Sequence, residues 1–153
     1  MCGLNLIFGP KRNPQWIETM NDHLVHRGPD ASGIYHCDKN NLSMGSTRLK
    51  IIDLNSGDMP YRSSCSRYSM VFNGEIYNHN ELRKELNNYT FNSQTDGEVL
   101  FALLQKEGVG ALQKVNGMFS LCFYDEVENE LCIARDRLGI KPLFYAMQND
   151  TFY

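Results

Sequence analysis

The sequence has no stretch that approaches the 18 consecutive apolar residues of a membrane-spanning helix. Its first ten residues carry no basic segment, and their short apolar run ends at Gly9-Pro10 without a small-residue cleavage site. A secretory signal is therefore not expected, and the expected location is cytoplasmic. A surplus of basic charge is lacking too. The formal net charge of −3 disfavours a protein that binds nucleic acid or an anionic membrane.

The cysteines do not form the pattern of a disulfide framework or of a zinc site. There are five of them, none in a Cys-x-x-Cys pair, and no histidine pair has metal-binding spacing. We expect Cys122 and Cys132 to be small buried apolar side chains. With 153 residues, 42% of them hydrophobic, the chain has the size and balance of one domain with a single sizeable core.

Four segments of the sequence are expected to form helices. Asn13-Pro14 combines a capping residue with a proline at the first helical position, and apolar residues follow at helical spacing. Thr95 and Glu98 have the spacing of a capping box, and Gly108 ends that segment. A further helix is expected over residues 79–86, and a short one over 111–114.

Strands are expected over 2–8, 33–36, 42–47 and 68–72. The segments 118–124 and 131–134 are almost continuously apolar, and a further apolar run covers 143–147. Because a hairpin with one wet face would alternate apolar and polar residues, both faces of these later strands should be covered. This pattern favours a layered fold, with sheet on sheet or a sheet between helices.

Cys2 is the most informative candidate for chemistry. Removal of Met1 would leave a residue that carries both a thiol and a free α-amine. These groups ordinarily have pKa values of about 8.5 and about 7.7–8.0. One residue would then supply a nucleophile and a proton acceptor near neutral pH. The alternative is that Cys2 is only an early strand residue.

Three further sites fit the binding of a polar substrate. Asn73-Gly74-Glu75 follows the strand expected to end at residue 72, and its amide donors could form an oxyanion hole. A simple turn is the alternative there. Arg48 could pair with a carboxylate, or be a surface cation. Asp96 could bind an ammonium group, or simply gain from the dipole of the helix that it begins.

Seven blocks, taken together, resemble the glutaminase domain of the asparagine synthetases, within the N-terminal-nucleophile class II glutamine amidotransferases. The blocks occur in the order of that family and span nearly the whole chain. They differ from the relatives that make glucosamine phosphate or phosphoribosylamine at the second and third blocks. The blocks are Met1-Cys2-Gly3 and residues 26–30 with 32–34, 48–53, 73–78, 95–98, 117–119 and 134–143.

The resemblance implies catalytic roles for three matched residues. Cys2 would be the nucleophile, with its α-amine as the general base. Asn73 and Gly74 would form the oxyanion hole. The implied fold is α+β, a four-layer αββα sandwich of two antiparallel sheets of the Ntn-hydrolase type, which agrees with the layered arrangement expected above.

The resemblance also implies how the substrate is held. Arg48 would bind the α-carboxylate of glutamine, and Asp96, together with Glu75, would bind its α-ammonium group. The pocket would further be lined by the backbone around three residues, Leu49, Ile51 and Ile52.

The implied function is that of a glutamine amidotransferase domain over residues 1–153. It would hydrolyse glutamine through a thioester and supply ammonia for the amidation of aspartate. No cofactor or metal is expected in this chain, because ATP and Mg belong to a C-terminal synthetase domain, and its Ser-Gly-Gly-x-Asp-Ser loop does not occur in these residues.

The expected partners are glutamine and a synthetase domain or subunit that accepts ammonia, with no nucleic acid and no membrane. A homodimer stays open. Two alternatives remain from the sequence. One is an amidotransferase domain whose acceptor is a sugar or a small carboxylate other than aspartate. The other is a non-catalytic interaction module on the same fold.

Overall fold

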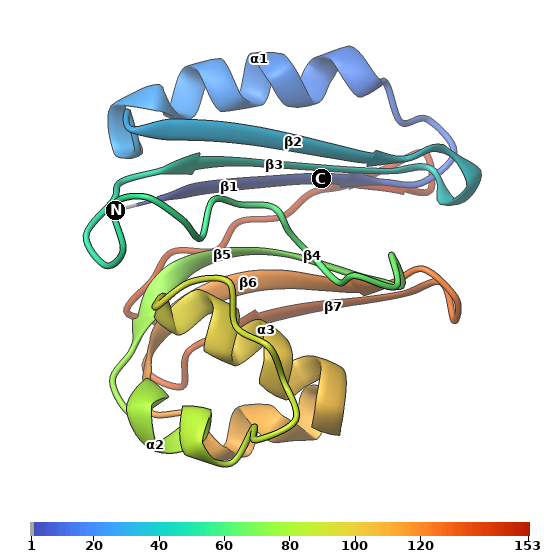
Figure 1. The fold of residues 1–153 in the computed structure, drawn as a ribbon. Helices are drawn as coiled ribbons and strands as arrows, with labels where there is room; N and C mark the ends of the chain where they lie inside the picture. Colours follow the sequence, from blue (N-terminus) through green and yellow to red (C-terminus); the bar gives the residue numbers. More distant parts are fainter. Residues whose placement is uncertain (1) are drawn as a thin grey trace.

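The computed structural model describes residues 2–153 and shows four layers (Figure 1). Helix α1 (Pro14–Leu24) covers a five-stranded antiparallel sheet, which faces a four-stranded antiparallel sheet. Helices α2 (His79–Lys84) and α3 (Asp96–Glu107) lie on the outer side of the second sheet. The expected α+β sandwich of the αββα type is confirmed. Within residues 2–153, no helix is long and apolar enough to cross a membrane.

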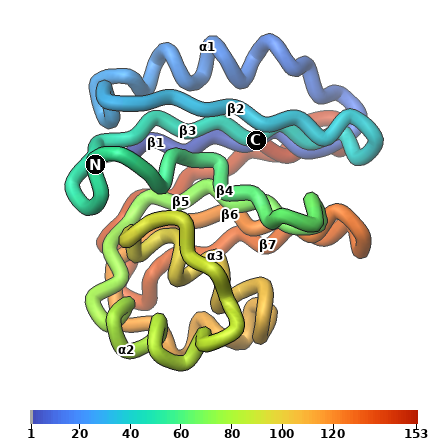
Figure 2. The backbone as a smooth tube through the Cα atoms, viewed as in Figure 1, coloured from blue at the N-terminus to red at the C-terminus, as the bar shows by residue number. Residues whose placement is uncertain are grey.

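The first sheet has the strand order β2-β3-β1-β9-β8, and the second has the order β4-β5-β6-β7. The strands of the first sheet are β1 (Gly3–Phe8), β2 (Ala31–Cys37), β3 (Leu42–Arg48), β8 (Met147–Gln148) and β9 (Thr151–Phe152). Those of the second are β4 (Tyr61–Arg62), β5 (Tyr68–Ile76), β6 (Gly117–Asp125) and β7 (Glu130–Arg135). Short 3₁₀ segments lie at Val25–Arg27, Asp38–Asn40 and Val109–Lys114. The tube in Figure 2 shows that the beginning of β1 lies beside the loop that follows β3.

Helix α1 is held on the first sheet by an apolar residue and a buried amide. Ile17 is fully buried, and Asn21 is 3% exposed. The amide nitrogen of Asn21 donates to three acceptors on β2 and β3 at 3.1–3.3 Å, and its oxygen accepts from Asn5 Nδ2 at 2.9 Å. Gly45 leaves the space for this amide, because a Cβ atom there would lie 2.5 Å from Asn21 Oδ1. A buried polar side chain with satisfied hydrogen bonds fixes the position of the helix at little cost.

Helix α3 begins and ends where the sequence predicts. The Thr95 hydroxyl accepts from the Glu98 backbone nitrogen at 3.3 Å, and Gly108 ends the helix with a φ of 69°. The Glu98 carboxylate does not complete a capping box. It accepts instead from the backbone nitrogens of Asn92 at 2.8 Å and Ser93 at 2.7 Å. These two hydrogen bonds tie the helix to the segment that precedes it.

The expectation that β5 ends at residue 72 is wrong. The strand continues through Asn73, Gly74 and Glu75, which pair with Ser120, Phe119 and Met118 of β6. Asn-Gly is a strong turn signal, but here β6 supplies a complete ladder partner. Gly74 has a packing reason to be glycine, since a Cβ atom would lie 2.4 Å from the Met118 carbonyl oxygen.

The expectation that the last apolar segments are strands covered on both faces is only partly confirmed. Strand β6 is buried from residue 119 to 124, whereas β7 is half-exposed because it is the edge strand of its sheet. Cys122 is buried, but Cys132 is only half-buried. The run at 143–147 is not a covered strand. Phe144 is 90% exposed and Tyr145 is 74% exposed, and only Met147 enters a strand, the two-residue edge strand β8.

Candidate active site

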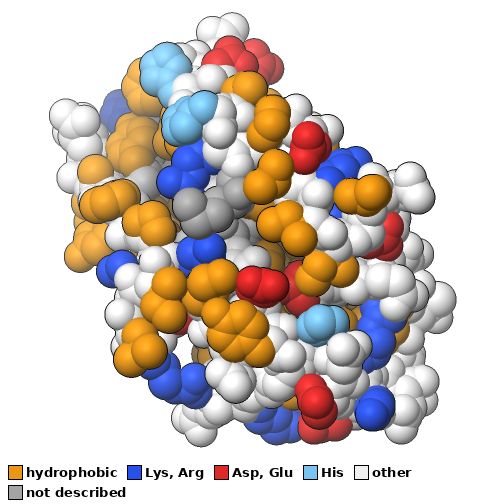
Figure 3. Space-filling view, turned by 90° about the vertical axis from the view of Figure 1, so that its left-hand side faces the viewer, with side chains coloured by type: hydrophobic (Ala, Val, Ile, Leu, Met, Phe, Trp, Pro, Cys, Tyr) orange, Lys and Arg blue, Asp and Glu red, His pale blue; other side chains and the backbone are white. Residues whose placement is uncertain are grey.

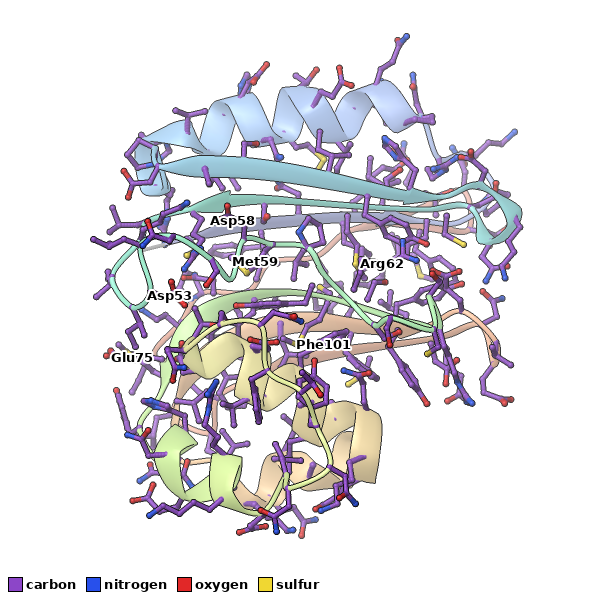
Figure 4. All side chains as sticks on the ribbon, viewed as in Figure 1. Asp53, Asp58, Met59, Arg62, Glu75 and Phe101 are labelled. Atoms are coloured by element: carbon purple, nitrogen blue, oxygen red, sulfur yellow. The ribbon has the colours of Figure 1, made fainter. Side chains whose placement is uncertain are left out.

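A cavity of about 140 Å³ lies at the end of the sandwich where β1 begins and β3 ends. Its wall contains every residue that the sequence analysis singled out for catalysis or substrate binding. Figure 3 looks at this end of the molecule, where basic and acidic side chains lie among exposed hydrophobic ones. Figure 4 shows Asp53 and Asp58 on the loop after β3 and Glu75 at the same end. The predicted residues that line the cavity are Cys2, Arg48, Leu49, Ile51, Ile52, Asn73, Gly74, Glu75 and Asp96.

Cys2 reaches the cavity because it directly precedes the central strand β1. Its side chain is half-buried and packs against the apolar cluster formed between the second sheet and helices α2 and α3. The next residue, Gly3, donates its backbone N–H to Thr47 Oγ1 at 3.2 Å. A Cβ atom at Gly3 would lie 2.6 Å from the same oxygen, so a side chain is not tolerated there. The close approach of β1 and β3 therefore fixes the thiol at the mouth of the sandwich.

Asn73, on β5 of the second sheet, supplies an amide to the same cavity. It is 5% exposed, and its side chain forms no hydrogen bond with another residue in the described range 2–153. A buried amide without a partner is rare unless a ligand or water satisfies it. With the neighbouring Gly74, it brings donor groups to the cavity that the thiol also lines. This arrangement can stabilise negative charge on a carbonyl oxygen attacked by Cys2.

Arg48 has an unexpected set of contacts. It is 5% exposed, and its two terminal nitrogens hold the loop that follows β3. Nη1 donates at 2.6 Å to Ser56 O and to Asp58 Oδ1, and Nη2 donates to the carbonyl oxygens of residues 52 and 53 at 3.0 and 2.9 Å. Its role as the carboxylate-binding group stays a prediction. To bind a carboxylate, Arg48 would have to use its Nε atom or give up some of these contacts with the loop.

Asp53 ties the same loop to the segment before α3. Its carboxylate accepts from the backbone nitrogens of Ser56 at 3.0 Å and Gln94 at 2.9 Å. Hydrogen bonds from the Ser56 side chain and from the Gln94 backbone lower the pKa of Asp53 to about 2. The loop that walls the cavity is thus anchored at both Arg48 and Asp53, although part of it is exposed, with Ile51 at 73%.

Asp96 lies in the first turn of α3 and is 7% exposed. Its Oδ2 accepts from the Ile76 backbone nitrogen at 2.8 Å, which joins the helix to the end of β5. Burial raises the pKa of this carboxyl above its ordinary value, although the N–H groups of Ile76 and Gly97 act in the opposite direction. Asp96 and the exposed Glu75 make one side of the cavity acidic, which suits an ammonium group.

Sequence reasoning missed Lys141, which also lines the cavity. It falls inside the last matched block, but a lysine in a loop normally indicates a solvated surface cation. In the structure it is 5% exposed. Nothing in the spacing of the sequence signals this burial, because it results from the way the loop after β7 folds back over the end of β6. Other lining residues without an assigned role are Met59, Tyr61, Phe72, Thr95 and Met118.

The loop after β7 is built around the carboxylate of Asp136, which is 6% exposed. Oδ1 accepts from the backbone nitrogens of Leu138 and Ile140 at 3.1 and 2.9 Å. Oδ2 accepts from those of Phe119 and Lys141 at 3.2 and 3.0 Å. Burial alone would raise the pKa of this carboxyl, but the backbone donors, led by that of Lys141, hold it below its ordinary value.

Replacing Asp136 with alanine is expected to lower the free energy of unfolding by about 3 kcal/mol, since four backbone donors lose a charged acceptor. For a domain of this size that corresponds to a drop in Tm of roughly 6–12 °C, measured by calorimetry. The folded-state pKa is lowered, so the contribution is complete above the ordinary value of about 3.9 and is lost as the pH falls through the folded-state pKa. The difference in Tm between the two proteins should therefore shrink in strong acid. Asp22→Ala, at an exposed position of α1, is the control and should leave Tm unchanged.

The four-layer sandwich, with a cysteine before its first strand and a cavity that combines amide donors with carboxylates, has the architecture of the N-terminal nucleophile hydrolases. Comparison with known proteins gives the family. The model of the glutamine amidotransferase domain matches residues 1–153. The chain belongs to the glutamine amidotransferase domain family.

The similar proteins include two named as glutamine-hydrolysing asparagine synthetases. Asparagine synthetase 1 of Bacillus subtilis is 42% identical over 161 residues, covering 100% of this chain and 25% of the relative. Asparagine synthetase B of Escherichia coli is 42% identical over 120 residues, covering 78% of this chain and 21% of the relative. Amidase chry2 of Gibberella zeae is 32% identical over 165 residues, covering 98% and 25%. The chain thus spans about a quarter of the length of these relatives.

Proposed function

We propose that this domain hydrolyses glutamine to glutamate and ammonia, with Cys2 as the nucleophile. The observation that carries the proposal is the cavity of about 140 Å³ that brings Cys2, the unpaired amide of Asn73 and the carboxylate of Asp96 together from three separate elements. Glutamine needs these groups: a nucleophile for its amide carbon, a donor for its amide oxygen and an anion for its ammonium group.

The reaction begins once Met1 has been removed, because this frees the α-amine of Cys2. The amine takes the thiol proton, and the sulfur attacks the side-chain amide carbon of glutamine. The tetrahedral intermediate places its negative oxygen near Asn73 and Gly74. As the C–N bond breaks, the proton passes from the amine to the leaving ammonia. Water, deprotonated by the same amine, then hydrolyses the γ-glutamyl thioester to glutamate.

The cavity offers charged partners for both α-groups of glutamine. Asp96, supported by Glu75, holds the α-ammonium group, and Arg48 holds the α-carboxylate. The backbone around the three residues of the loop after β3 closes the remaining wall; these residues are Leu49, Ile51 and Ile52. Contacts to the α-groups change little during the reaction, so they determine affinity rather than the rate of the chemical step.

We further propose that the domain is part of a longer cytoplasmic enzyme of the asparagine-synthetase type, in which a synthetase domain accepts the ammonia. The length of the relatives and the names of two of them support this proposal. ATP and Mg would bind in that domain, and aspartate would be the acceptor. An acceptor other than aspartate is the second candidate, because the relative from Gibberella zeae is named an amidase and not a synthetase.

The proposal is tested with purified residues 1–153, after intact-mass analysis has established that Met1 is lost. Ammonia release from L-glutamine is expected, and D-glutamine, which places its α-groups differently, is the control and should give none. Calorimetry with ATP and with aspartate is expected to show no binding. Absence of ammonia release from the processed protein would contradict the proposed hydrolysis, and ATP binding at sub-millimolar affinity would contradict the division of labour between domains.

A further inference from the structure

Lys141 is a buried cation without an anionic partner. The residue is 5% exposed and lines the same cavity as Cys2 and Asn73. Within residues 2–153, its hydrogen bonds are made by its backbone nitrogen and carbonyl oxygen, and none involves Nζ. Nζ is not one of the fully enclosed polar atoms without a partner, so the ammonium group keeps access to solvent and is free to pair with an anion. Because the side chain borders the cavity, a negatively charged ligand there is the partner that would satisfy it.

The position of Lys141 is fixed next to the expected oxyanion hole. Its backbone nitrogen and that of Phe119 both donate to Asp136 Oδ2, at 3.0 and 3.2 Å. Phe119 is in turn the ladder partner of Gly74. Arg135 Nε donates to the Lys141 carbonyl oxygen at 2.5 Å and holds the other side of the residue. The backbone of Lys141 is therefore held, through Asp136 and Phe119, beside Gly74 of the second sheet, whereas Arg48 belongs to β3 of the first sheet.

Arg48 and Lys141 are the two cationic residues that line the cavity, and they differ in how many of their N–H donors remain available to a ligand. Both terminal nitrogens of Arg48 are occupied by the loop after β3. The three N–H bonds of Lys141 have no acceptor within the described residues. The acidic groups Asp96 and Glu75 are expected to bind the α-ammonium group. A cation held beside Gly74, a residue of the expected oxyanion hole, matches negative charge that the substrate carries only during and after the reaction.

We propose that Lys141 binds negative charge at the reacting end of the substrate, as a further catalytic residue of this site. The inference rests on the proposed glutamine hydrolysis. When the Cys2 sulfur forms its bond to the amide carbon, the π electrons of the C=O bond move to oxygen, and the Lys141 ammonium donates a hydrogen bond to that oxygen without losing its proton. After hydrolysis, the same ammonium pairs with the γ-carboxylate of glutamate.

This assignment makes Lys141 a residue that discriminates product from substrate. Glutamine and glutamate share their α-groups and differ in the neutral amide or charged carboxylate at the reacting end. A contact with the α-carboxylate would affect both ligands equally. A contact at the reacting end would favour glutamate and would also stabilise the transition state more than bound glutamine, thereby raising kcat.

Calorimetry on Cys2→Ala protein, which binds without turnover, separates these cases. Adding Lys141→Met is expected to weaken glutamate binding about 10-fold, the equivalent of one charge-assisted hydrogen bond, and glutamine binding less than about twofold. Lys141→Arg keeps the charge and should retain most of the glutamate affinity. Lys114→Met, which removes a surface lysine paired with Glu85 and Glu107, is the matched control and should change neither affinity.

In protein with an intact Cys2, Lys141→Met is expected to lower kcat for glutamine at least 10-fold with little change in KM. Equal weakening of glutamine and glutamate, or an unchanged glutamate affinity, would overturn the assignment. If Lys141→Met does not fold, Lys141→Gln provides the same comparison with an uncharged polar side chain. Failure of the proposed function is a different result: the unmodified protein would release no ammonia, and Cys2→Ala protein would bind neither amino acid.

Discussion

Replacement of Cys2 by alanine is expected to abolish glutamine hydrolysis, with a loss of at least about 10⁴-fold in kcat. The reason is that alanine keeps the α-amine and the cavity but removes the atom that forms the thioester. Binding of glutamine should persist, because the groups expected to hold its α-amine and α-carboxylate lie on other elements. The measurement is steady-state ammonia release at saturating glutamine, with calorimetry to show that the ligand still binds.

Cys65 provides a demanding control for this result. It is exposed, and a hydrogen bond with the Ser63 side chain lowers the pKa of its thiol, which favours the reactive thiolate. Cys65→Ala should leave hydrolysis unchanged, and a diazo-ketone analogue of glutamine should label only the N-terminal peptide. Normal turnover in the Cys2→Ala protein, or labelling directed to Cys65, would refute the mechanism.

The second large effect is expected at Asn73, and a paired variant at Asp96 separates chemistry from binding. Asn73 donates to charge that develops only in the tetrahedral intermediate, so Asn73→Ala should lower kcat by about 10²–10³ with little change in KM. Asp96 holds an ammonium group that is present throughout, so Asp96→Asn should mainly raise KM. Initial-rate measurements over a range of glutamine concentrations distinguish the two. Equal losses of kcat with unchanged KM in both variants would contradict the assignment.

The pH dependence gives an independent test of Asp96. Burial raises the pKa of this carboxyl, and only its ionised form attracts an ammonium group. In the unmodified protein, KM should therefore start to rise on acidification at a higher pH than an ordinary aspartate would give, whose pKa is about 3.9. Asp96→Asn removes this acid limb while keeping a side-chain oxygen that can accept from Ile76. An unchanged acid limb in the variant would show that another group is responsible.

Local chemistry in the sequence was sufficient to predict much of this molecule. Asn13-Pro14 and Thr95 begin helices where their capping side chains satisfy free backbone N–H groups, and both helices appear there. The almost unbroken apolar character of 118–124 predicted a strand covered on both faces, and β6 is that strand. The seven blocks indicated the family. A nucleophile, amide donors and charged groups each have a recognisable chemical purpose, which singled out Cys2, Asn73-Gly74, Arg48 and Asp96 as candidates. The other four predicted site residues were named only through the resemblance to the family.

Other features depended on contacts between segments far apart in the chain. Asn73-Gly74-Glu75 has the local preference of a turn, yet it forms strand because β6 pairs with it and Gly74 allows the close approach. The run at 143–147 is as apolar as a core strand, yet Phe144 lies at the surface, and only Met147 pairs with a neighbouring strand, in the two-residue edge strand β8. The burial of Lys141 follows from four backbone N–H groups converging on Asp136, one of them from β6. Sequence pattern determines which side chains are suited to a cavity, but only tertiary contacts decide which of them lose water and which keep unpaired donors for a ligand.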